Sequence, residues 1–249
     1  MWPRRSDVLF IGVSGTQVTW QFAGSAPQTA SLSVQGGPFE QIAATIEAPS
    51  MPLQFAAVHV VAGSGVARHW LQTAPPGLRS LSELQALVQS RAEQLFGDDP
   101  DWVVAADWHA TRPFLCAALP REIDRLASAV ARSKGATPHV ATSLSLALNQ
   151  HARHMPHEGW TVLHEPEALH LLYFSAGKLE FTRTVTIPVA VQASALESEV
   201  TAEVARSSAL AGGLPTGPLK VMSMNKDPAA TQSGTASSLA AWPYDVRMK

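Results

Sequence analysis

Short apolar runs, each closed by glycine, proline or small polar residues, fill the first 61 positions of the chain. The runs at 8–13 and 18–22 flank a small-residue turn, which predicts a β-hairpin, and residues 29–34 predict a third strand. Apolar side chains at 38–48 recur at helical spacing and end at prolines, which predicts a short amphipathic helix. A further strand is predicted at 54–61. The opening order is therefore β-β-β-α-β.

Helical stripes and short apolar runs alternate over the rest of the chain, up to residue 222. Helices are predicted at 81–97, 120–135, 143–151 and 192–211, and strands at 102–106, 113–119, 137–141, 160–163, 168–175, 179–187 and 219–222. The glycine-rich start of segment 63–70 predicts a loop. Residues 154–159 predict a hinge between lobes, and residues 226–241 lose periodicity and predict a flexible segment.

The composition indicates a globular chain that folds without metals or disulfides. Of its 249 residues, 46% are hydrophobic and 15% charged, and 18 Lys and Arg against 20 Asp and Glu give a net charge of −2. This balance provides no positive field for nucleic acid or an anionic membrane, so we exclude both as primary partners. Cys116, the single cysteine, lies in an apolar run, which favours a buried structural thiol. No apolar run reaches the roughly 18–20 residues of a membrane-spanning helix, so we expect a cytoplasmic protein with no direct membrane insertion.

The same order of elements occurs twice along the chain. Residues 8–61 and 160–222 each run three strands, a helix and a strand. This duplication, with an insertion in the first copy, resembles the ground plan of the actin-like (ribonuclease H-like) α/β fold, whose two lobes clamp a nucleotide. The resemblance implies a first lobe at 1–155 with an inserted subdomain at about 75–141, a second lobe at 156–225, and a flexible C-terminal tail at 226–249.

Several stretches carry a closer resemblance. They are residues 9–13 with 18–20, 114–120 followed by 135–138, 176–183 and 203–207. In order and pattern they resemble the actin-like cytoplasmic proteins of type IV pilus and type II secretion assembly platforms, namely the PilM-type proteins and the cytoplasmic domain of GspL-type proteins. The resemblance extends over roughly residues 7–223.

This resemblance implies a non-catalytic adaptor that sits at the cytoplasmic face of the inner membrane and is held there by a protein partner. In PilM-type proteins, a groove between the core of the first lobe and its inserted subdomain receives the extended cytoplasmic N-terminal tail of an inner-membrane platform protein. A GspL-type role adds a contact with the assembly ATPase. Carried over to this sequence, the groove has five expected lining residues: Phe55, Val58, Leu84, Val88 and Phe114.

The nucleotide elements of the fold depart from the pattern of its ATP-using members. Those members need an Asp near each phosphate hairpin to hold Mg²⁺, and glycines where the backbone approaches phosphate. The first hairpin keeps four small residues but has no acid in its turn: Gly12, Ser14, Gly15 and Thr16. The second hairpin, at 163–167, lacks Asp-x-Gly, and residues 220–224 replace the late Gly-Gly. We therefore expect no cofactor, no metal and little or no ATP hydrolysis. An actin-like ATP-binding protein or ATPase with divergent phosphate loops is the alternative.

Other polar groups are compatible with chemistry, although a structural role is favoured for each. Ser14 follows Gly12 as in a hydrolase nucleophile turn, but the next predicted element is a strand instead of a helix. A weaker third hypothesis is accordingly an α+β hydrolase that uses Ser14 or His164. The second hairpin gathers groups suited to acid–base chemistry: His164, Glu165, Glu167 and His170. Three histidines spaced by three suggest a Zn²⁺ site that Pro156 interrupts: His151, His154 and His157.

Arginine and tryptophan side chains supply the remaining candidates for partner contacts. Arg183 and Arg206 lie in the stretches that resemble the second lobe of the family. Exposed tryptophan is enriched in binding hot spots, and three of the seven tryptophans fall in predicted loops or near an end: Trp70, Trp108 and Trp242.

Overall fold

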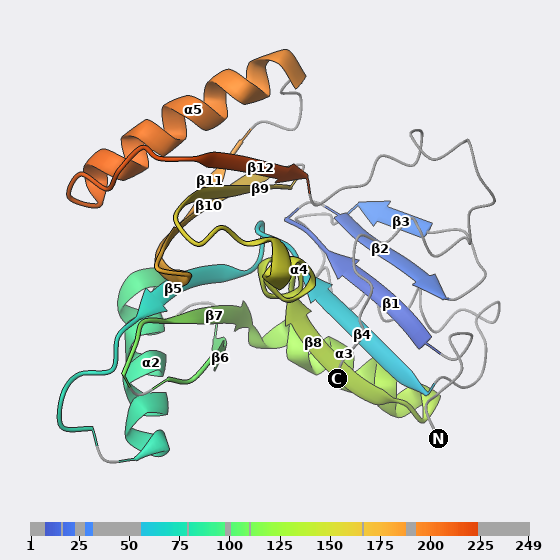
Figure 1. Ribbon diagram of the computed structural model, residues 1–249. Helices are drawn as coiled ribbons and strands as arrows, with labels where there is room; N and C mark the ends of the chain where they lie inside the picture. Colours follow the sequence, from blue (N-terminus) through green and yellow to red (C-terminus); the bar gives the residue numbers. More distant parts are fainter. Residues whose placement is uncertain are drawn as a thin grey trace. The chain divides into compact units, whose positions relative to one another are not determined.

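The chain forms two compact units, each built around helices packed on β-sheets (Figure 1). The computed structural model describes residues 8–15, 17–22, 28–31, 56–78, 80–97, 101–109, 111–165, 167–187 and 193–223. The first unit takes its described residues from 1–67 and 119–146, and the second from 68–118 and 147–225.

A five-stranded sheet forms the first unit. Its strands are β1 (Val8–Val13), β2 (Gln17–Phe22), β3 (Gln28–Ser31), β4 (Ala57–Ala62) and β8 (Thr137–Thr142), in the order β3-β2-β1-β4-β8. The first three strands are antiparallel to one another, whereas β4 and β8 run parallel to β1. Alternate residues of β1 are buried, as expected for a strand with one face on a core.

Helix α3 (Arg121–Lys134) covers the core of this sheet. Its buried side chains, which include Ile123 and Leu126, pack with Leu9 and Ile11 of β1. The helix ends at Gly135, whose φ of 64° lies in the left-handed region that favours glycine and whose N–H caps the last turn. The carboxylates of the first turn and the cations of the last turn both suit the helix dipole.

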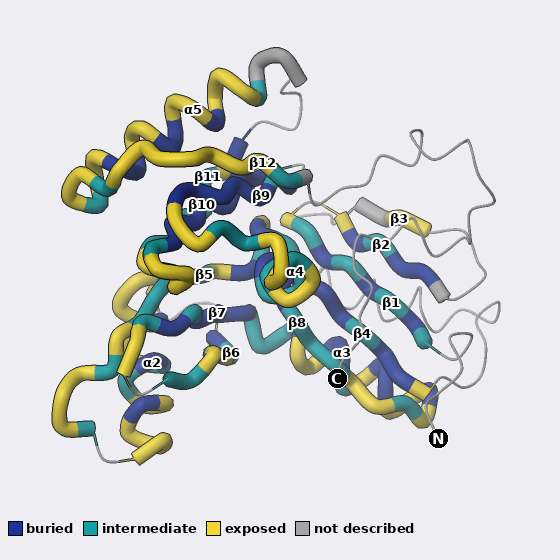
Figure 2. The backbone as a smooth tube through the Cα atoms, in the orientation of Figure 1, coloured by how far each residue is buried: buried dark blue, intermediate teal, exposed yellow. Residues whose placement is uncertain are grey.

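The second unit contains a three-stranded sheet with its own helix. Strands β5 (Arg68–Gln72), β7 (Phe114–Pro120) and β6 (Trp102–Ala106) lie in that order, and α2 (Leu81–Phe96) shares a core with them. Ser80 caps α2 by accepting a hydrogen bond from the N–H of Glu83. The burial colours of Figure 2 show α2 buried on one side and exposed on the other.

A four-stranded sheet completes the second unit. Its strands are β9 (Gly159–Glu165), β10 (Ala168–Ser175), β11 (Lys178–Thr186) and β12 (Leu219–Ser223), in the order β11-β10-β9-β12. Helix α5 (Ala193–Leu210) packs on one face of it around Trp160 and Tyr173. Helix α4 (Ser143–His151), capped by the Thr142 hydroxyl, and the short 3₁₀ helix η2 (Ala152–His154) precede β9.

The structure confirms most of the predicted elements and corrects one. Residues 68–72, predicted as part of a loop, form β5, and Trp70 lies buried in it. The glycine-rich turn before β5 hid the strand, because its partner β7 follows more than forty residues later. The predicted hinge at 154–159 lies within the second unit, where Gly177 donates to the carbonyl of His157. The helix predicted at 38–48 and the tail at 226–249 lie outside the described residues, and the predicted lobe boundaries stay predictions.

Candidate functional site

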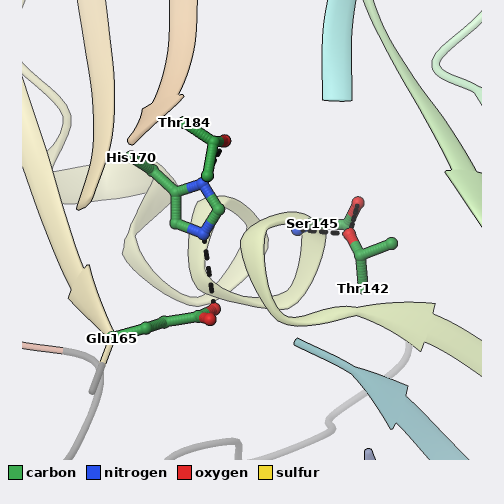
Figure 3. A network of polar contacts seen from close by, with 5 residues as sticks. All are labelled: Thr142, Ser145, Glu165, His170 and Thr184. Atoms are coloured by element: carbon green, nitrogen blue, oxygen red, sulfur yellow. Dashed lines mark hydrogen bonds and ion pairs between the residues drawn. The ribbon is translucent and has the colours of Figure 1, made fainter. Parts of the chain in front are cut away.

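A buried polar network lies at the second hairpin, between β9 and β10 (Figure 3). His170 is fully buried. Its Nδ1 lies 2.9 Å from the hydroxyl of Thr184, and its Nε2 lies 3.3 Å from Oε1 of Glu165. Both ring nitrogens of His170 are therefore occupied by protein groups.

Strand register explains why these residues meet. Glu165, the last residue of β9, pairs with Ala168 of β10. Side chains alternate across a strand, so His170 shares the face of Ala168 and reaches Glu165. Thr184 of β11 lies directly opposite His170. His164, by contrast, is next to Glu165 in β9 and points to the opposite face.

His69 of β5 extends the network. Its ring meets that of His170 edge to face, with centroids 5.6 Å apart. Burial, reinforced by the neighbouring His170, lowers the pKa of His69 to about 3, although Glu165 acts in the opposite direction. His69 therefore stays uncharged in the folded protein at neutral pH. The sequence indicated Glu165 and His170 within a group of four acid–base residues but missed His69, because β5 was not predicted.

The arrangement favours support of the hairpin over chemistry. Glu165 is about 8% exposed, and its carboxylate contacts His170 instead of facing solvent. Oε1 of Glu165 would have to give up this contact in order to coordinate Mg²⁺ or to orient water. Within the described parts of the chain, no group of three or more His, Cys, Asp or Glu side chains is placed to hold a metal ion.

The first hairpin is closed by its own hydrogen bonds. The N–H of Ser14 donates to the carbonyl of Gln17 at 2.8 Å, and the Ser14 hydroxyl accepts from the N–H of Gln17 at 3.0 Å. Gly12 is the fifth residue of β1, Gly15 is exposed, and Thr16 lies outside the described residues. The element after Ser14 is the strand β2, so the geometry of a nucleophile turn, which leads into a helix, is absent from this hairpin.

Neither hairpin shows, in its described residues, the Asp-containing pattern of the ATP-using members of the fold. The first carries no carboxylate in its turn. Of the two glutamates of the second, Glu165 is held by His170. Metal-assisted phosphoryl transfer needs free carboxylates at these places. We accordingly derive no catalytic step through a nucleotide.

The predicted groove residues occupy cores. Val58 is fully buried in the core of the first unit. Leu84, Val88 and Phe114 are buried together in the core under α2. Phe55 lies outside the described residues. A partner does not reach buried side chains directly, and the groove stays a prediction.

Most of the remaining candidates contact other residues within the described parts of the chain. His151 and His154 meet edge to face at 6.3 Å, whereas His157 lies beside the turn at Gly177. Burial raises the pKa of Cys116 to about 12, which makes it a poor nucleophile. Trp70 is buried, Trp108 packs on Phe114, and Trp242 is outside the described residues.

Arg183 and Arg206 both contact the buried carboxylate of Glu203 on α5. Arg183 Nη1 lies 3.7 Å from Oε2 of Glu203, and Arg206 hydrogen-bonds to Oε1. Arg183 also donates to the hydroxyl of Ser207 at 3.3 Å. Arg183 therefore links β11 to α5, whereas the Arg206–Glu203 contact lies within α5.

Comparison with known proteins identifies the fold. A protein of Bacteroides thetaiotaomicron, described as having an actin-like ATPase fold and unknown function, matches with a TM-score of 0.57 and 8% identity over 91% of this chain and 84% of its own. The chain thus has an actin-like α/β fold, as its element order predicts.

Two further structures are more distant. The cytoplasmic domain of EpsL, an inner-membrane component of the type II secretion system of Vibrio cholerae, matches with a TM-score of 0.49 and 13% identity over 87% of this chain and 82% of its own. A PilM–PilN type IV pilus biogenesis complex matches with a TM-score of 0.45 and 17% identity over 82% of this chain and 66% of its own. No protein-family description and no curated protein sequence matches the chain. None of the helices in the described residues is long and apolar enough to cross a membrane.

Proposed function

We propose that the chain is a non-catalytic adaptor of a type IV pilus or type II secretion-like assembly platform. It works at the cytoplasmic face of the inner membrane and binds the cytoplasmic segment of an inner-membrane partner. The proposal combines the actin-like fold with the sequence resemblance to PilM-type and GspL-type proteins. The observation that carries the non-catalytic part is the engagement of Glu165 by the buried His170.

The contact between Glu165 and His170 supports a binding role over a catalytic one. A carboxylate that accepts a hydrogen bond inside a protein gives up that bond when it is redirected to a metal ion, and the partner left behind is buried and unsatisfied. Here the partner is His170, which is fully buried. The second hairpin is therefore built for rigidity, which suits a scaffold.

Binding of a platform-protein tail tests the proposal. A synthetic peptide with the cytoplasmic N-terminal tail of a platform protein from the same genome is titrated by calorimetry. We expect saturable binding that Leu84→Ala in the predicted groove weakens at least about tenfold, through repacking of the elements that line it. Leu126→Ala is the matched control. It also truncates a buried leucine, at a similar cost of about 2–5 kcal/mol in stability, but in the core under α3. Absence of binding to any platform tail contradicts the proposal.

The alternative is an ATP-binding protein with divergent phosphate loops. It is favoured by the fold itself and by the small residues kept in the first hairpin, among them Gly12 and Gly15. It requires measurable affinity for magnesium–nucleotide.

A further inference from the structure

Among the described strands, β12 ends its sheet and is paired on one side only. In the first unit, β4 runs parallel to the first strand of its sheet and is paired on its other side by β8. In the second unit, β12 occupies the same place next to β9 but has no second partner among the described strands. The side chains show the same difference: Val58 and Val60 of β4 are fully buried, whereas Leu219 and Val221 of β12 are 41% and 46% exposed (Figure 2).

The backbone of β12 is oriented to accept another strand. The N–H of Trp160 in β9 donates to the carbonyl of Pro218 at 2.8 Å. Residues of a parallel strand alternate in the side to which they direct N–H and C=O. The backbone N–H and C=O groups of the even-numbered residues of β12 therefore point toward β9. Those of Leu219 and Val221 point toward the unpaired edge.

The two faces of β12 differ in chemistry. Leu219 and Val221 pair with Trp160 and Val162, so they lie on the apolar face that α5 covers. Lys220 lies on the opposite face, where its ammonium donates to the carbonyl of His154 at 2.9 Å.

Other basic residues lie near Lys220, at the end of α4 and in η2. The charge of Lys220 is one of the causes that lower the pKa of His151, after burial and His154, so these groups are close together. Arg153 is exposed on the same 3₁₀ helix.

We propose that the open edge of β12 binds an extended segment of another protein in which apolar and acidic residues alternate. The apolar side chains continue the row of Leu219 and Val221, and the acidic side chains meet the basic group around Lys220. Addition of a strand to an exposed edge is a common mode of peptide recognition. The site goes beyond the proposed function, because it is separate from the predicted groove and does not require a platform partner.

Two other occupants are disfavoured. A second copy paired through its own β12 brings the Lys220 groups of both copies to the same face at short range, and like charges there repel. The chain's own residues after 223 contain Pro228 and Pro243 and a long run of small residues, a composition depleted in strands.

Peptide binding to the full-length chain tests the site. Two labelled seven-residue peptides are compared, one alternating valine with glutamate and the other alternating valine with lysine. We expect the glutamate peptide to bind at least about tenfold more tightly. Val221→Pro removes an N–H that faces the open edge and should weaken binding about tenfold or more, whereas Leu210→Lys, an exposed control at the end of α5, should not. Lys220→Glu, which leaves the strand backbone intact, should abolish the preference for glutamate.

Hydrogen exchange separates the possible occupants. The amides of Leu219 and Val221 should exchange quickly in the free protein and slowly with the glutamate peptide. Protection of both amides in the free monomer shows that the chain fills its own edge and overturns the proposal. A dimer that Val221→Lys dissociates, or equal affinity for the two peptides, overturns it as well.

Discussion

At the scale of single residues, His69 makes the stability of the second unit depend on pH. Its pKa is lowered from 6.5 to about 3, mainly by burial. The unfolded chain takes up a proton as the pH falls through 6.5, but the folded chain does not, so stability is lost between about pH 6.5 and pH 3. At pH 5 this loss amounts to about 2 kcal/mol.

We expect His69→Gln to reduce that loss. Urea unfolding of both proteins at pH 7 and pH 5 gives the difference in unfolding free energy, and the variant should lose about 2 kcal/mol less than the parent. The exposed His157→Gln also removes one histidine and serves as the control. An unchanged difference for His69→Gln contradicts the burial of a neutral imidazole.

The candidate site was predictable only where residues close in sequence were also close in space. Glu165 and His170 sit on one hairpin, so their meeting follows from strand alternation. His69 joins them from a distant strand, and a single sequence carries no signal for that contact. The sequence also predicted which groove positions are apolar. It did not distinguish apolar residues that line a surface from Leu84 and Val88, which fill a core.

At the scale of elements, a close backbone approach fixes the start of β9. Gly159 has a φ of 111°, and a Cβ built on it would lie 2.5 Å from the carbonyl oxygen of Pro218, just before β12. Gly135, at the end of α3, also has a positive φ but has nothing within 4 Å of such a Cβ. Substituting each of the two glycines therefore distinguishes the cost of backbone strain alone, at Gly135, from strain combined with steric overlap, at Gly159.

Gly159→Ala should destabilise the protein by at least about 3 kcal/mol, since strain and a backbone clash add. Gly135→Ala should cost only about 1 kcal/mol. Thermal unfolding followed by circular dichroism measures both, and equal losses would show that β9 and β12 separate without cost. Because the clash falls on the β9–β12 pairing, Gly159→Ala should also speed amide exchange in β12 more than in β10.

Element type and order were predictable because the spacing of apolar residues and the positions of proline and glycine indicate the same elements over most of the chain. Proline and glycine mark both ends of α3, and alternation marks β1. Strand β5 was missed for the opposite reason: it is short, begins with a charged residue and follows a glycine-rich turn. Pairing with β7, a tertiary effect, decides its conformation.

At the scale of the whole molecule, the fold and the chemistry of its hairpins lead to opposite expectations for nucleotide. The actin-like fold predicts binding, whereas the self-closed turn at Ser14 and the engaged carboxylate of Glu165 predict none. A ligand that binds only the folded state stabilises it by RT ln(1 + [L]/Kd), about 2.7 kcal/mol at a hundredfold excess over Kd. For a chain of this size such a gain raises the melting temperature by several degrees.

We expect 5 mM magnesium–ATP, roughly a physiological concentration, to shift the melting temperature by less than about 1 °C relative to magnesium alone. His170→Ala tests the reason, because it removes the group that holds Glu165. If nucleotide binding fails because His170 holds the carboxylate of Glu165, nucleotide should stabilise this variant more than the parent, although the variant is less stable without nucleotide. A shift of several degrees in the parent protein contradicts the adaptor proposal in its non-catalytic form and favours the ATP-binding alternative.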